Sequence, residues 1–495
     1  MANVKRVDLF IDGRFEPARS GETFAAINPA SEEPVAEVAL AAAEDVDRAV
    51  TAARRAFEEG PWPRLPAADR AAYLRAVADA LEENEETLAT LEAMDTGLPI
   101  TFTRGHASRA AIHFRYFAGE VERLSGTTHP QDEAYLHLTT REPVGVAAIV
   151  TPWNAPLSLA TSGAAAALAC GNTCVLKPSE LAPVTTAELA KVFEALELPP
   201  GVVNVIHGPG QPTGEALAVH PEVNAVAFTG GTVTGRRIME GAARTLKRFV
   251  GELGGNAPTL VFADADLDRA LDGTLLCAFA NNGEACVAGS RILVERPLYD
   301  TFVQRFVARA KAIRIGDPLE PETEMGPIIA PRHLERLQGM IRGAVEAGAT
   351  VCCGGGRPRG MERGYYLEPT VLTGVRPGSA VLREEVLGPV VTITPFQDEA
   401  EGVTMANDTP FGLAGYVWSG RADRLLRVAR RLRAGTVWAN TALMRDVRVP
   451  FGGYKQSGVG RLGGLHSIHA FTEVKNTCIA IDPHAMPSMG RGGAS

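Results

Sequence analysis

The stretch that decides the fold runs from residue 144 to residue 178 and reads VGVAAIV-TPWN-APLSLATSGAAAALA-CGN-TCVL-KP. Residues 144–150 form an apolar run typical of a strand buried in a parallel sheet. Residues 156–169 are rich in alanine and leucine, which predicts a helix, and residues 173–176 predict a second short strand. A strand, a helix and a strand in this order predict a βαβ unit with a right-handed crossover.

The same alternation continues along the chain in two blocks. The first block continues with expected strands at 202–206 and 223–228 and expected helices at 185–196, 213–219 and 235–250. The second has expected strands at 257–262, 290–294, 390–395, 415–418 and 436–440, with helices at 266–281, 298–313, 331–347 and 421–433. Further helices are expected at 43–58, 67–94 and 104–122, and an extended strand at 470–481. This order predicts an α/β protein with two doubly wound lobes.

Composition argues against several classes of protein. Lys and Arg together number 49 and Asp and Glu 58, for a net charge of −9, so we expect no nucleic-acid partner. The most apolar stretch is too short to cross a membrane, and no secretory signal is evident, so we expect no membrane partner. The seven cysteines are an odd number in a long chain and favour reduced thiols in the cytoplasm. No Cys or His pair has the spacing of a zinc site, so no metal is expected.

Polar and glycine residues follow several of the expected strands. Gly230 and Gly231 follow one strand and precede a helix, where backbone amides can bind a phosphate, although a tight turn explains them equally well. Lys177 and Glu180 follow another strand and suit ribose hydroxyls, the alternative being an exposed loop.

Three further residues could have a catalytic role, but each also has an ordinary structural explanation. Cys286 lies between Gly283 and Gly289, but a lone cysteine in such a chain is usually an inert core residue. Glu252 beside a Gly-Gly pair is most often a solvated helix end, and Asn154 after a strand is most often a turn former.

Taken together, seven short motifs resemble the aldehyde dehydrogenase superfamily, in its order and at its approximate spacing over residues 8–481. They are Thr151-Pro-Trp-Asn154, Lys177-Pro-Ser-Glu180, Phe228-Thr-Gly-Gly-Thr232, Glu252-Leu-Gly-Gly255, Gly283-Glu-Ala-Cys286, Glu384-Glu385-Val-Leu-Gly-Pro389 and Pro450-Phe-Gly-Gly453. The resemblance implies an enzyme that oxidises an aldehyde to a carboxylic acid with NAD.

The resemblance also implies roles for the catalytic residues. Cys286 would be the nucleophile that forms a thiohemiacetal and then a thioester, and Asn154 would stabilise the oxyanion. Glu252 would activate the water that hydrolyses the thioester. Relatives that pass the acyl group to coenzyme A commonly lack this glutamate, so its presence favours hydrolysis.

The implied cofactor is NAD, because the carboxylate of Glu180 would repel the 2′-phosphate of NADP. The expected cofactor-binding residues are Thr151, Pro152, Trp153, Lys177, Ser179, Glu180, Gly210, Phe228, Thr229, Gly230, Gly231, Leu253, Glu385 and Leu387. Leu387 is a departure, since many members have phenylalanine at that position.

The substrate is expected to be an aldehyde that carries a carboxylate. The loop Arg445-Asp446-Val-Arg448-Val-Pro450 and the segment Gly463-Gly-Leu-His466-Ser467 resemble the hydroxymuconic and aminomuconic semialdehyde dehydrogenase branch. There, arginines matching Arg109 and Arg448 would bind the carboxylate, unless Arg448 only pairs with Asp446. The expected substrate-binding residues are Arg109, Ala155, Ser162, Arg448 and Phe451. Neutral aromatic or aliphatic aldehydes are the alternative substrates, and a catalytically retired binding protein is the alternative function.

The resemblance also divides the chain. Residues 1–122 and 144–254 would form a Rossmann-like NAD-binding domain, and residues 255–466 the catalytic domain. Residues 123–143 and 467–482 would form an oligomerisation hairpin, which predicts a homodimer or homotetramer. Residues 483–495 are expected to be a loose tail.

Overall fold

The first lobe is built on a twisted sheet with the strand order β20-β12-β11-β8-β9-β10-β2-β3. In this computed structural model, which describes residues 5–131, 133–482 and 489–490, five of its strands run parallel. They are β8 (Val146–Val150), β9 (Thr173–Lys177), β10 (Val203–Val205), β11 (Ala225–Thr229) and β12 (Arg248–Glu252). The antiparallel strands β2 (Leu9–Ile11), β3 (Arg14–Glu16) and β20 (Gly458–Val459) complete the two ends.

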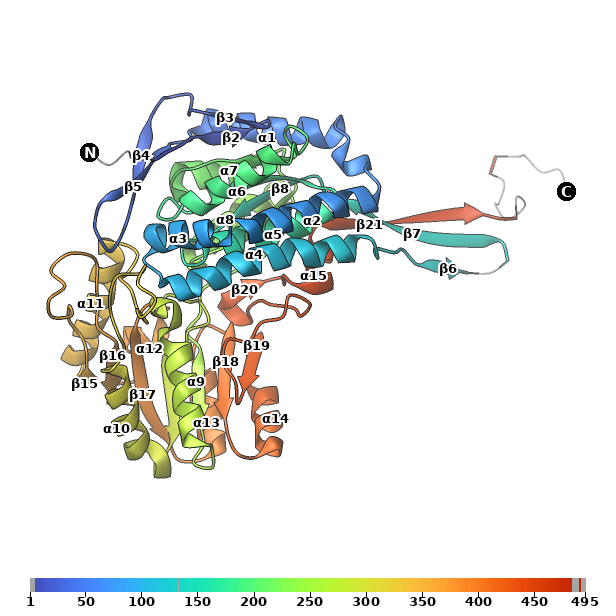
Figure 1. Ribbon diagram of the computed structural model, residues 1–495. Helices are drawn as coiled ribbons and strands as arrows, with labels where there is room; N and C mark the ends of the chain where they lie inside the picture. Colours follow the sequence, from blue (N-terminus) through green and yellow to red (C-terminus); the bar gives the residue numbers. More distant parts are fainter. Residues whose placement is uncertain (1–4, 132, 483–488, 491–495) are drawn as a thin grey trace.

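Helices cover both faces of this sheet because the side chains of β8 alternate between them. Val146, Ala148 and Val150 pack on one face against α1 (Ala43–Glu58), α7 (Glu215–Val219) and α8 (Thr232–Ala243). Ala147 and Ile149 face α5 (Pro156–Ala169) and α6 (Val184–Ala195). On the side of α5 and α6 away from the sheet lie α2 (Ala67–Glu83), α3 (Glu85–Thr96) and α4 (Ile100–Val121), drawn in blue in Figure 1.

The second lobe is a sheet with the order β15-β16-β17-β14-β13-β18-β19, in which β15 alone is antiparallel among the described strands. Its strands are β13 (Pro258–Val261), β14 (Arg291–Glu295), β15 (Thr350–Cys353), β16 (Thr370–Thr373), β17 (Val390–Phe396), β18 (Ala414–Trp418) and β19 (Thr436–Ala439). Its helices are α9 (Leu267–Phe279), α10 (Tyr299–Ala310), α11 (Pro331–Glu346), α12 (Ala380–Arg383), α13 (Glu399–Asn407) and α14 (Ala422–Arg431). The two parallel sheets confirm the predicted α/β fold with two lobes.

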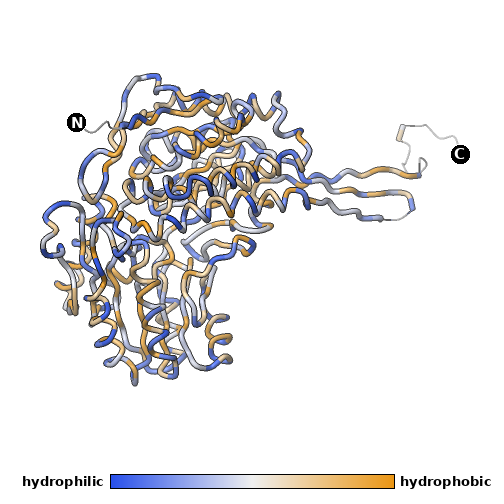
Figure 2. Tube along the Cα trace, viewed as in Figure 1, coloured by the Kyte–Doolittle hydropathy of each residue, from blue (hydrophilic) through white to orange (hydrophobic). Residues whose placement is uncertain are grey.

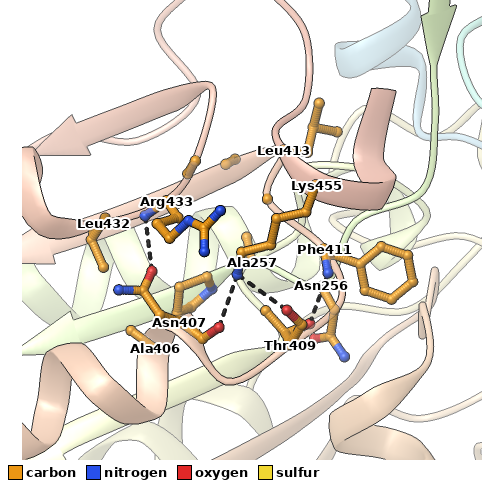
Figure 3. Close-up of a pocket in the computed structure, with 14 residues that line it drawn as sticks. Asn256, Ala257, Ala406, Asn407, Thr409, Phe411, Leu413, Leu432, Arg433 and Lys455 are labelled. Carbon is orange, nitrogen blue, oxygen red and sulfur yellow. Dashed lines mark hydrogen bonds between the residues drawn. The ribbon is translucent and has the colours of Figure 1, made fainter. Parts of the chain in front are cut away.

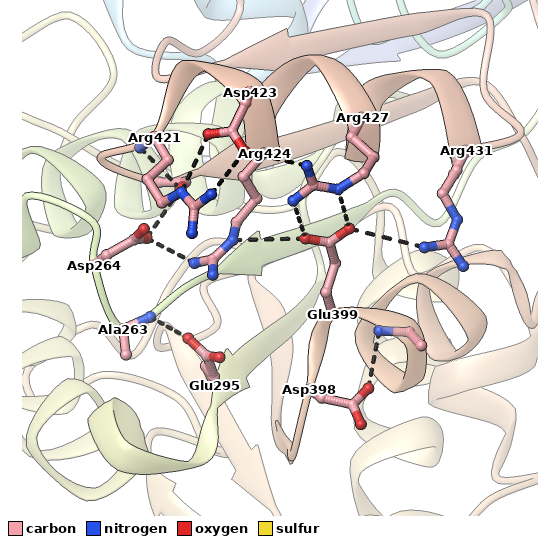
Figure 4. A network of polar contacts seen from close by, with 12 residues as sticks. Ala263, Asp264, Glu295, Asp398, Glu399, Arg421, Asp423, Arg424, Arg427 and Arg431 are labelled. Atoms are coloured by element: carbon pink, nitrogen blue, oxygen red, sulfur yellow. Dashed lines mark hydrogen bonds and ion pairs between the residues drawn. The ribbon is translucent and has the colours of Figure 1, made fainter.

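Ion pairs hold the arginine-rich helix α14 at the edge of the second lobe. Glu399 at the start of α13 is within 4 Å of Arg424, Arg427 and Arg431 (Figure 4). Arg424 also pairs with Asp264 at 3.0 Å and lies over the ring of Phe262. Arginines spaced along one helix thus converge on a few acids, which fixes the helix without making a free basic surface.

Two smaller sheets extend from the lobes. One near the N-terminus contains β1 (Lys5–Val7), β4 (Thr23–Ile27) and β5 (Pro34–Ala39). The other contains β6 (Thr128–Pro130), β7 (Tyr135–Pro143) and β21 (Thr472–Ala480), and it projects from the body as an arm (Figure 1). Figure 2 shows that apolar stretches continue along this arm, outside either core. Among the described residues, no helix is both long and apolar enough to cross a membrane.

Short elements join these parts. They are the helical turns η1 (Trp62–Arg64), η2 (Gly210–Gly214), η3 (Ala280–Gly283), η4 (Arg296–Leu298) and η5 (Lys455–Ser457), and the helix α15 (Gly464–Ala470). Asn172 joins the residue before β8, helix α5 and the residue after α15: its side chain accepts from the backbone of Gly145 and donates to the carbonyls of Ala167 and Phe471.

The structure corrects two of the predicted elements. The helix expected at 235–250 ends at Ala243, and residues from Arg248 form strand β12. The chain turns because Leu246 is in the left-handed region and the Lys247 ammonium donates to the carbonyls of His220 and Val223. The helix expected at 67–94 is broken at Asn84, whose side chain donates back to Ala80. The N-terminal strands were not predicted, and nearly all of the expected tail at 483–495 lies outside the described residues.

The two lobes face each other through opposite strand ends. The carboxyl ends of β8, β9, β11 and β12 lead into Thr151, Lys177, Thr229 and Glu252. The chain passes from β12 directly to the amino end of β13, and residue 286 lies just before the amino end of β14. Residues that follow the first sheet therefore meet residues that precede the second.

Candidate active site

Cys286 lies on a sharply bent loop between α9 and β14. Asn281 and Asn282 are both in the left-handed region, with φ of 57° and 56°, and Gly283 follows at 70°. Asparagine tolerates this conformation better than most residues, because its short side chain bonds locally. The bend places Cys286 between the lobes, where it is partly buried and lines two cavities.

Side-chain amides lock this loop to the first lobe. The Asn154 amide donates to the carbonyl of Glu284 at 2.8 Å, and the Asn281 amide donates to the carbonyl of Asn154 at 2.7 Å. Asn282 donates to the carbonyls of Gly97 and Pro327 and accepts from the backbone of Gly326. These buried bonds make the position of Cys286 depend on both lobes.

Two cavities meet at Cys286. The empty space between the walls, including the part open to solvent, is about 830 Å³ in one and about 1220 Å³ in the other. Thr229, Glu252 and Cys286 line both of them. A group bound in one cavity can therefore reach the thiol together with a group bound in the other.

Burial controls the protonation of the two reactive groups. It raises the pKa of Cys286 to about 11, and the nearby positive charge of Arg445 opposes this shift. Burial also raises the pKa of Glu252 to about 8, opposed by the charges of Arg445 and Arg461. Neither carboxylate oxygen of Glu252 has a hydrogen-bond partner among the described residues. A carboxylate with such a pKa is a competent proton acceptor near neutral pH.

A glycine is required beside this carboxylate. Gly452 has a φ of +154°, and a Cβ at that position would lie 2.8 Å from Oε1 of Glu252. The segment Pro450–Gly453 therefore passes close to Glu252 only because it has no side chain at residue 452.

The smaller cavity is lined largely by residues expected to bind a cofactor. These are Pro152, Trp153, Thr229, Gly230, Gly231, Leu253, Glu385 and Leu387. The Glu385 carboxylate accepts from the backbone of Gly255 at 2.9 Å, and burial raises its pKa to about 7. The second carboxylate oxygen of Glu385, on the cavity wall, can accept a hydrogen bond from a sugar hydroxyl.

The remaining expected cofactor residues continue along the same sheet edge, outside this cavity. They are Thr151, Lys177, Ser179, Glu180, Gly210 and Phe228. Lys177 is buried and 3.8 Å from the carboxylate of Glu180, and burial lowers its pKa to about 8. At Gly231, immediately before α8, an added Cβ would meet nothing within 4 Å. The turn is thus open to an incoming phosphate at a helix N-terminus, as a dinucleotide requires.

Two arginines face the larger cavity without a charge partner. Arg109 on α4 and Arg445 on the loop after β19 both line it. Neither forms an ion pair or a hydrogen bond with any residue that the structure describes. Arg445 stacks over the ring of Phe451 at 3.8 Å. Two guanidinium groups on one cavity wall have the chemistry that suits an anion.

Of the other residues expected to bind the substrate, two line the larger cavity and two do not. Ser162 and Phe451 line the larger cavity, whereas Ala155 lies at the start of α5 and is absent from its lining. Arg448 is 74% exposed, donates to both carboxylate oxygens of Asp446, and does not line the cavity. Arg445 rather than Arg448 therefore lines this cavity, and the structure agrees with the alternative in which Arg448 only pairs with Asp446.

Several residues of the site were missed by the sequence reasoning. His333 and Arg336 of α11 line the smaller cavity; His333 contacts the carbonyl of Leu387 at 2.6 Å, and Arg336 donates to the carbonyls of Glu385 and Val386. Their spacing of three on one helix was the available signal.

The loop that carries Arg445 returns to the first sheet through Lys455. Lys455 donates to the carbonyls of Asn407 and Thr409, beside a small cavity that contains none of the expected site residues (Figure 3). The Ser457 hydroxyl then accepts from the backbone of Gly412. This anchoring fixes the end of the loop nearest β20.

Comparisons with known proteins agree with this geometry. A model of the aldehyde dehydrogenase family matches residues 15–477. A 2-hydroxymuconic semialdehyde dehydrogenase from a Pseudomonas species is 42% identical over 488 residues, which cover 97% of this chain and all of that protein. A 5-carboxymethyl-2-hydroxymuconate semialdehyde dehydrogenase from Escherichia coli is 42% identical over 94% of this chain and 99% of its own. The solved NAD⁺ complex of an aldehyde dehydrogenase from Bacillus cereus superposes with a TM-score of 0.95 at 41% identity, covering 97% of each chain.

Proposed function

The chain belongs to the aldehyde dehydrogenase family, and on that premise we propose that it oxidises aldehydes bearing a carboxylate to the corresponding acids with NAD. The observation that carries the proposal is the meeting of two cavities at Cys286, one suited to a dinucleotide and the other lined by two unpaired arginines. The names of its relatives support a substrate of the hydroxymuconic semialdehyde type.

The first chemical step is addition of the Cys286 thiolate to the aldehyde carbon. Glu252 lines both cavities beside the thiol and accepts its proton. The carbonyl oxygen then becomes an oxyanion, which needs donors already in place. The Asn154 amide uses one N–H on the carbonyl of Glu284, which leaves its second N–H and the backbone N–H of Cys286 for the oxyanion.

A nicotinamide dinucleotide, when bound, supplies the hydride acceptor. Lys177 and Glu180 would hold the adenosine ribose, and Gly230 and Gly231 leave room for the phosphates at the start of α8. Glu385 would hold the second ribose from the wall beside Leu387. Trp153 and Leu253 exclude water around this part of the cavity.

Hydrolysis of the resulting thioester completes the turnover. Glu252 takes a proton from water, the hydroxide adds to the thioester carbonyl, and the Cys286 thiolate leaves as the acid is released. The same carboxylate serves both half-reactions once Glu252 has released the thiol proton to solvent before hydrolysis begins. The acyl group passes to water because Glu252 is present, which separates this enzyme from acyl-transferring relatives.

The substrate carboxylate would be bound by Arg109 and Arg445. A planar guanidinium matches a carboxylate better than an ammonium does, and burial lowers the pKa of Arg109, as does the charge of Arg445. An anion between the two groups would relieve their mutual repulsion. A neutral aldehyde cannot, so the cavity favours semialdehydes.

We further propose that the arm mediates self-association in the cytoplasm. Strand β21 is exposed along most of its length, with Val474 and Ile479 open to solvent. Such an edge favours pairing with a second copy of the chain, as a homodimer or homotetramer. All seven cysteines are free, as expected in a reducing compartment.

The role of Glu252 predicts a pH dependence. Because burial raises the pKa of Glu252 to about 8 and the base must be ionised, steady-state oxidation should rise as pH increases through about 8. Glu252→Gln should lower the rate about 10²–10⁴-fold and remove this rise. NADH absorbance at pH 6–10 measures both, with the exposed Glu384→Gln as a control. A Gln variant that keeps the rise would contradict the assignment.

The role of Glu180 predicts a change of cofactor preference. Glu180→Gln removes the carboxylate that would repel a 2′-phosphate and frees the Lys177 ammonium, so the NAD over NADP ratio of kcat/KM should fall about tenfold or more. Initial rates with both cofactors give the ratio, and the exposed Glu194→Gln should leave it unchanged. An unaltered ratio in the Glu180 variant would count against ribose recognition by this residue.

Carboxylate recognition predicts selective loss on charged substrates. Arg109→Met should raise KM for 2-hydroxymuconic and succinic semialdehydes about 10–100-fold, because a charged hydrogen bond is lost, and should affect hexanal and benzaldehyde far less. A panel of these aldehydes, with Arg448→Met as the control, tests both the activity and the substrate class. Equal losses on charged and neutral aldehydes would remove the carboxylate hypothesis.

Self-association predicts a measurable mass. At micromolar concentration, light scattering should give at least twice the chain mass, and Val474→Asp with Ile479→Asp should lower it by placing charges on the exposed strand. A monomer in the unmodified protein would contradict the proposed role of the arm.

A further inference from the structure

Arg445 lies where the anion-binding wall of the larger cavity reaches the reacting groups. It lines the same cavity as Cys286 and Glu252. Its guanidinium is 3.8 Å from the centre of the Phe451 ring, and Phe451 packs in one apolar cluster with Cys286. The charge of Arg445 is therefore close to the nucleophile as well as to the substrate.

The backbone around Arg445 is held against the nucleophile loop. The Trp438 indole donates to the carbonyl of Met444 at 2.7 Å. Trp438 stacks on Tyr416 with ring centres 5.1 Å apart, and the Tyr416 hydroxyl donates to the carbonyl of Val287 at 2.8 Å. A continuous series of contacts thus runs from the residue before Arg445 to the residue after Cys286.

The charges around Cys286 are otherwise unfavourable to a thiolate. Glu252 and Glu385 both raise the pKa of this thiol through their negative charge, after the larger effect of burial, and Arg445 lowers it. Tyr416 is neutral, because burial raises the pKa of its phenol well above the usual value. Arg445 is the cation that offsets the two acids.

The titratable groups nearest Arg445 in the chain and on helix α4 do not neutralise its positive charge. Asp446, next in the chain, is engaged by Arg448. Arg109 on α4 is another cation, and burial keeps His113 on the same helix neutral by lowering its pKa to about 3. Among the described residues that line the two cavities, the acids are Glu252, Glu385 and Asp446, and Asp446 is already paired with Arg448.

We propose that Arg445 is a positioning residue for the chemical step itself: its charge stabilises the thiolate of Cys286 and the carboxylate of Glu252, whichever aldehyde is bound. Cys286 and Glu252 together carry one negative charge, which lies on the thiolate once the thiol proton has moved to Glu252. Arg445 attracts that charge on either atom, so it raises the population of the reactive state without fixing the proton. The proposal extends the proposed function, in which Arg445 also binds the substrate carboxylate.

The test is alkylation of Cys286 by iodoacetamide without aldehyde or cofactor. Peptide mapping by mass spectrometry separates Cys286 from Cys352 and Cys478, which are also accessible. The alkylation rate of Cys286 is measured as a function of pH. Arg445→Gln should move the midpoint of this pH dependence upward by about one pH unit, which is about a tenfold loss of rate at a fixed pH below the midpoint. Arg445→Lys should keep most of the wild-type rate, and Arg430→Gln, at an exposed position on helix α14, should leave the rate unchanged.

Salt supplies a measurement that needs no variant. Arg445 is exposed on the cavity wall, so raising salt from about 0.05 to 1 M should screen its charge and slow alkylation of the unmodified protein below the midpoint. Arg445→Gln should lose most of this salt dependence. Circular dichroism checks that each variant is folded.

Two results would overturn the proposal: an Arg445→Gln protein that alkylates like the wild type at every pH, or an Arg445→Lys protein as slow as the Gln variant. Neither depends on the substrate. If no aldehyde is oxidised but the midpoint still moves, the proposed function fails while this inference stands. If semialdehydes are oxidised and the midpoint does not move, Arg445 acts on the substrate alone.

Discussion

The hydrogen bonds between Asn154 and the loop that carries Cys286 are the interaction on which the site depends. One amide of each lobe donates to a carbonyl of the other, through Asn154 to Glu284 and Asn281 to Asn154. Both bonds are buried, so water does not replace them cheaply. They place the thiol between the two cavities and leave one N–H of Asn154 for the oxyanion. Loss of this contact would separate the nucleophile from the group that stabilises its product.

The two sheets explain why so many ionisable groups converge there. Strands of the first sheet end at the site and deliver Glu252 and Lys177, while the second sheet begins at the site just after Cys286. Burial raises the pKa of Glu252 to about 8 and that of Glu385 to about 7. These acids make the wall suitable for proton transfer and sugar hydroxyls, but they also oppose a thiolate. The unpaired charge of Arg445 offsets them.

The sequence was sufficient for the fold where apolar runs and turns agreed. The strand at 144–150 and the helix at 156–169 are close to the observed β8 and α5, because both are buried and uninterrupted. The prediction of a helix at 235–250 was wrong, because helical spacing continues in the sequence past Ala243. Only the tertiary contacts of Lys247 reveal the turn. The domain boundaries stay predictions.

The motifs singled out Asn154, Glu252 and Cys286, which the structure brings together at one cavity, but they did not decide between the neighbouring arginines. The catalytic roles of these residues stay predictions. Arg445 and Arg448 are three residues apart in a loop without periodicity, so the sequence raised the ion pair between Arg448 and Asp446 as an alternative but could not decide that it turns Arg448 outward. Asn281 and Asn282 carried no signal of their left-handed conformation beyond the neighbouring glycine.

The central claim is that Cys286 carries the acyl group, and its most direct test is peptide mapping of the trapped intermediate. Glu252→Gln protein would be mixed with NAD and succinic semialdehyde and quenched in acid. The account predicts a succinyl group on the Cys286 peptide that forms only when NAD is present. An acyl group on another cysteine, or none on any peptide while NADH is formed, would contradict it.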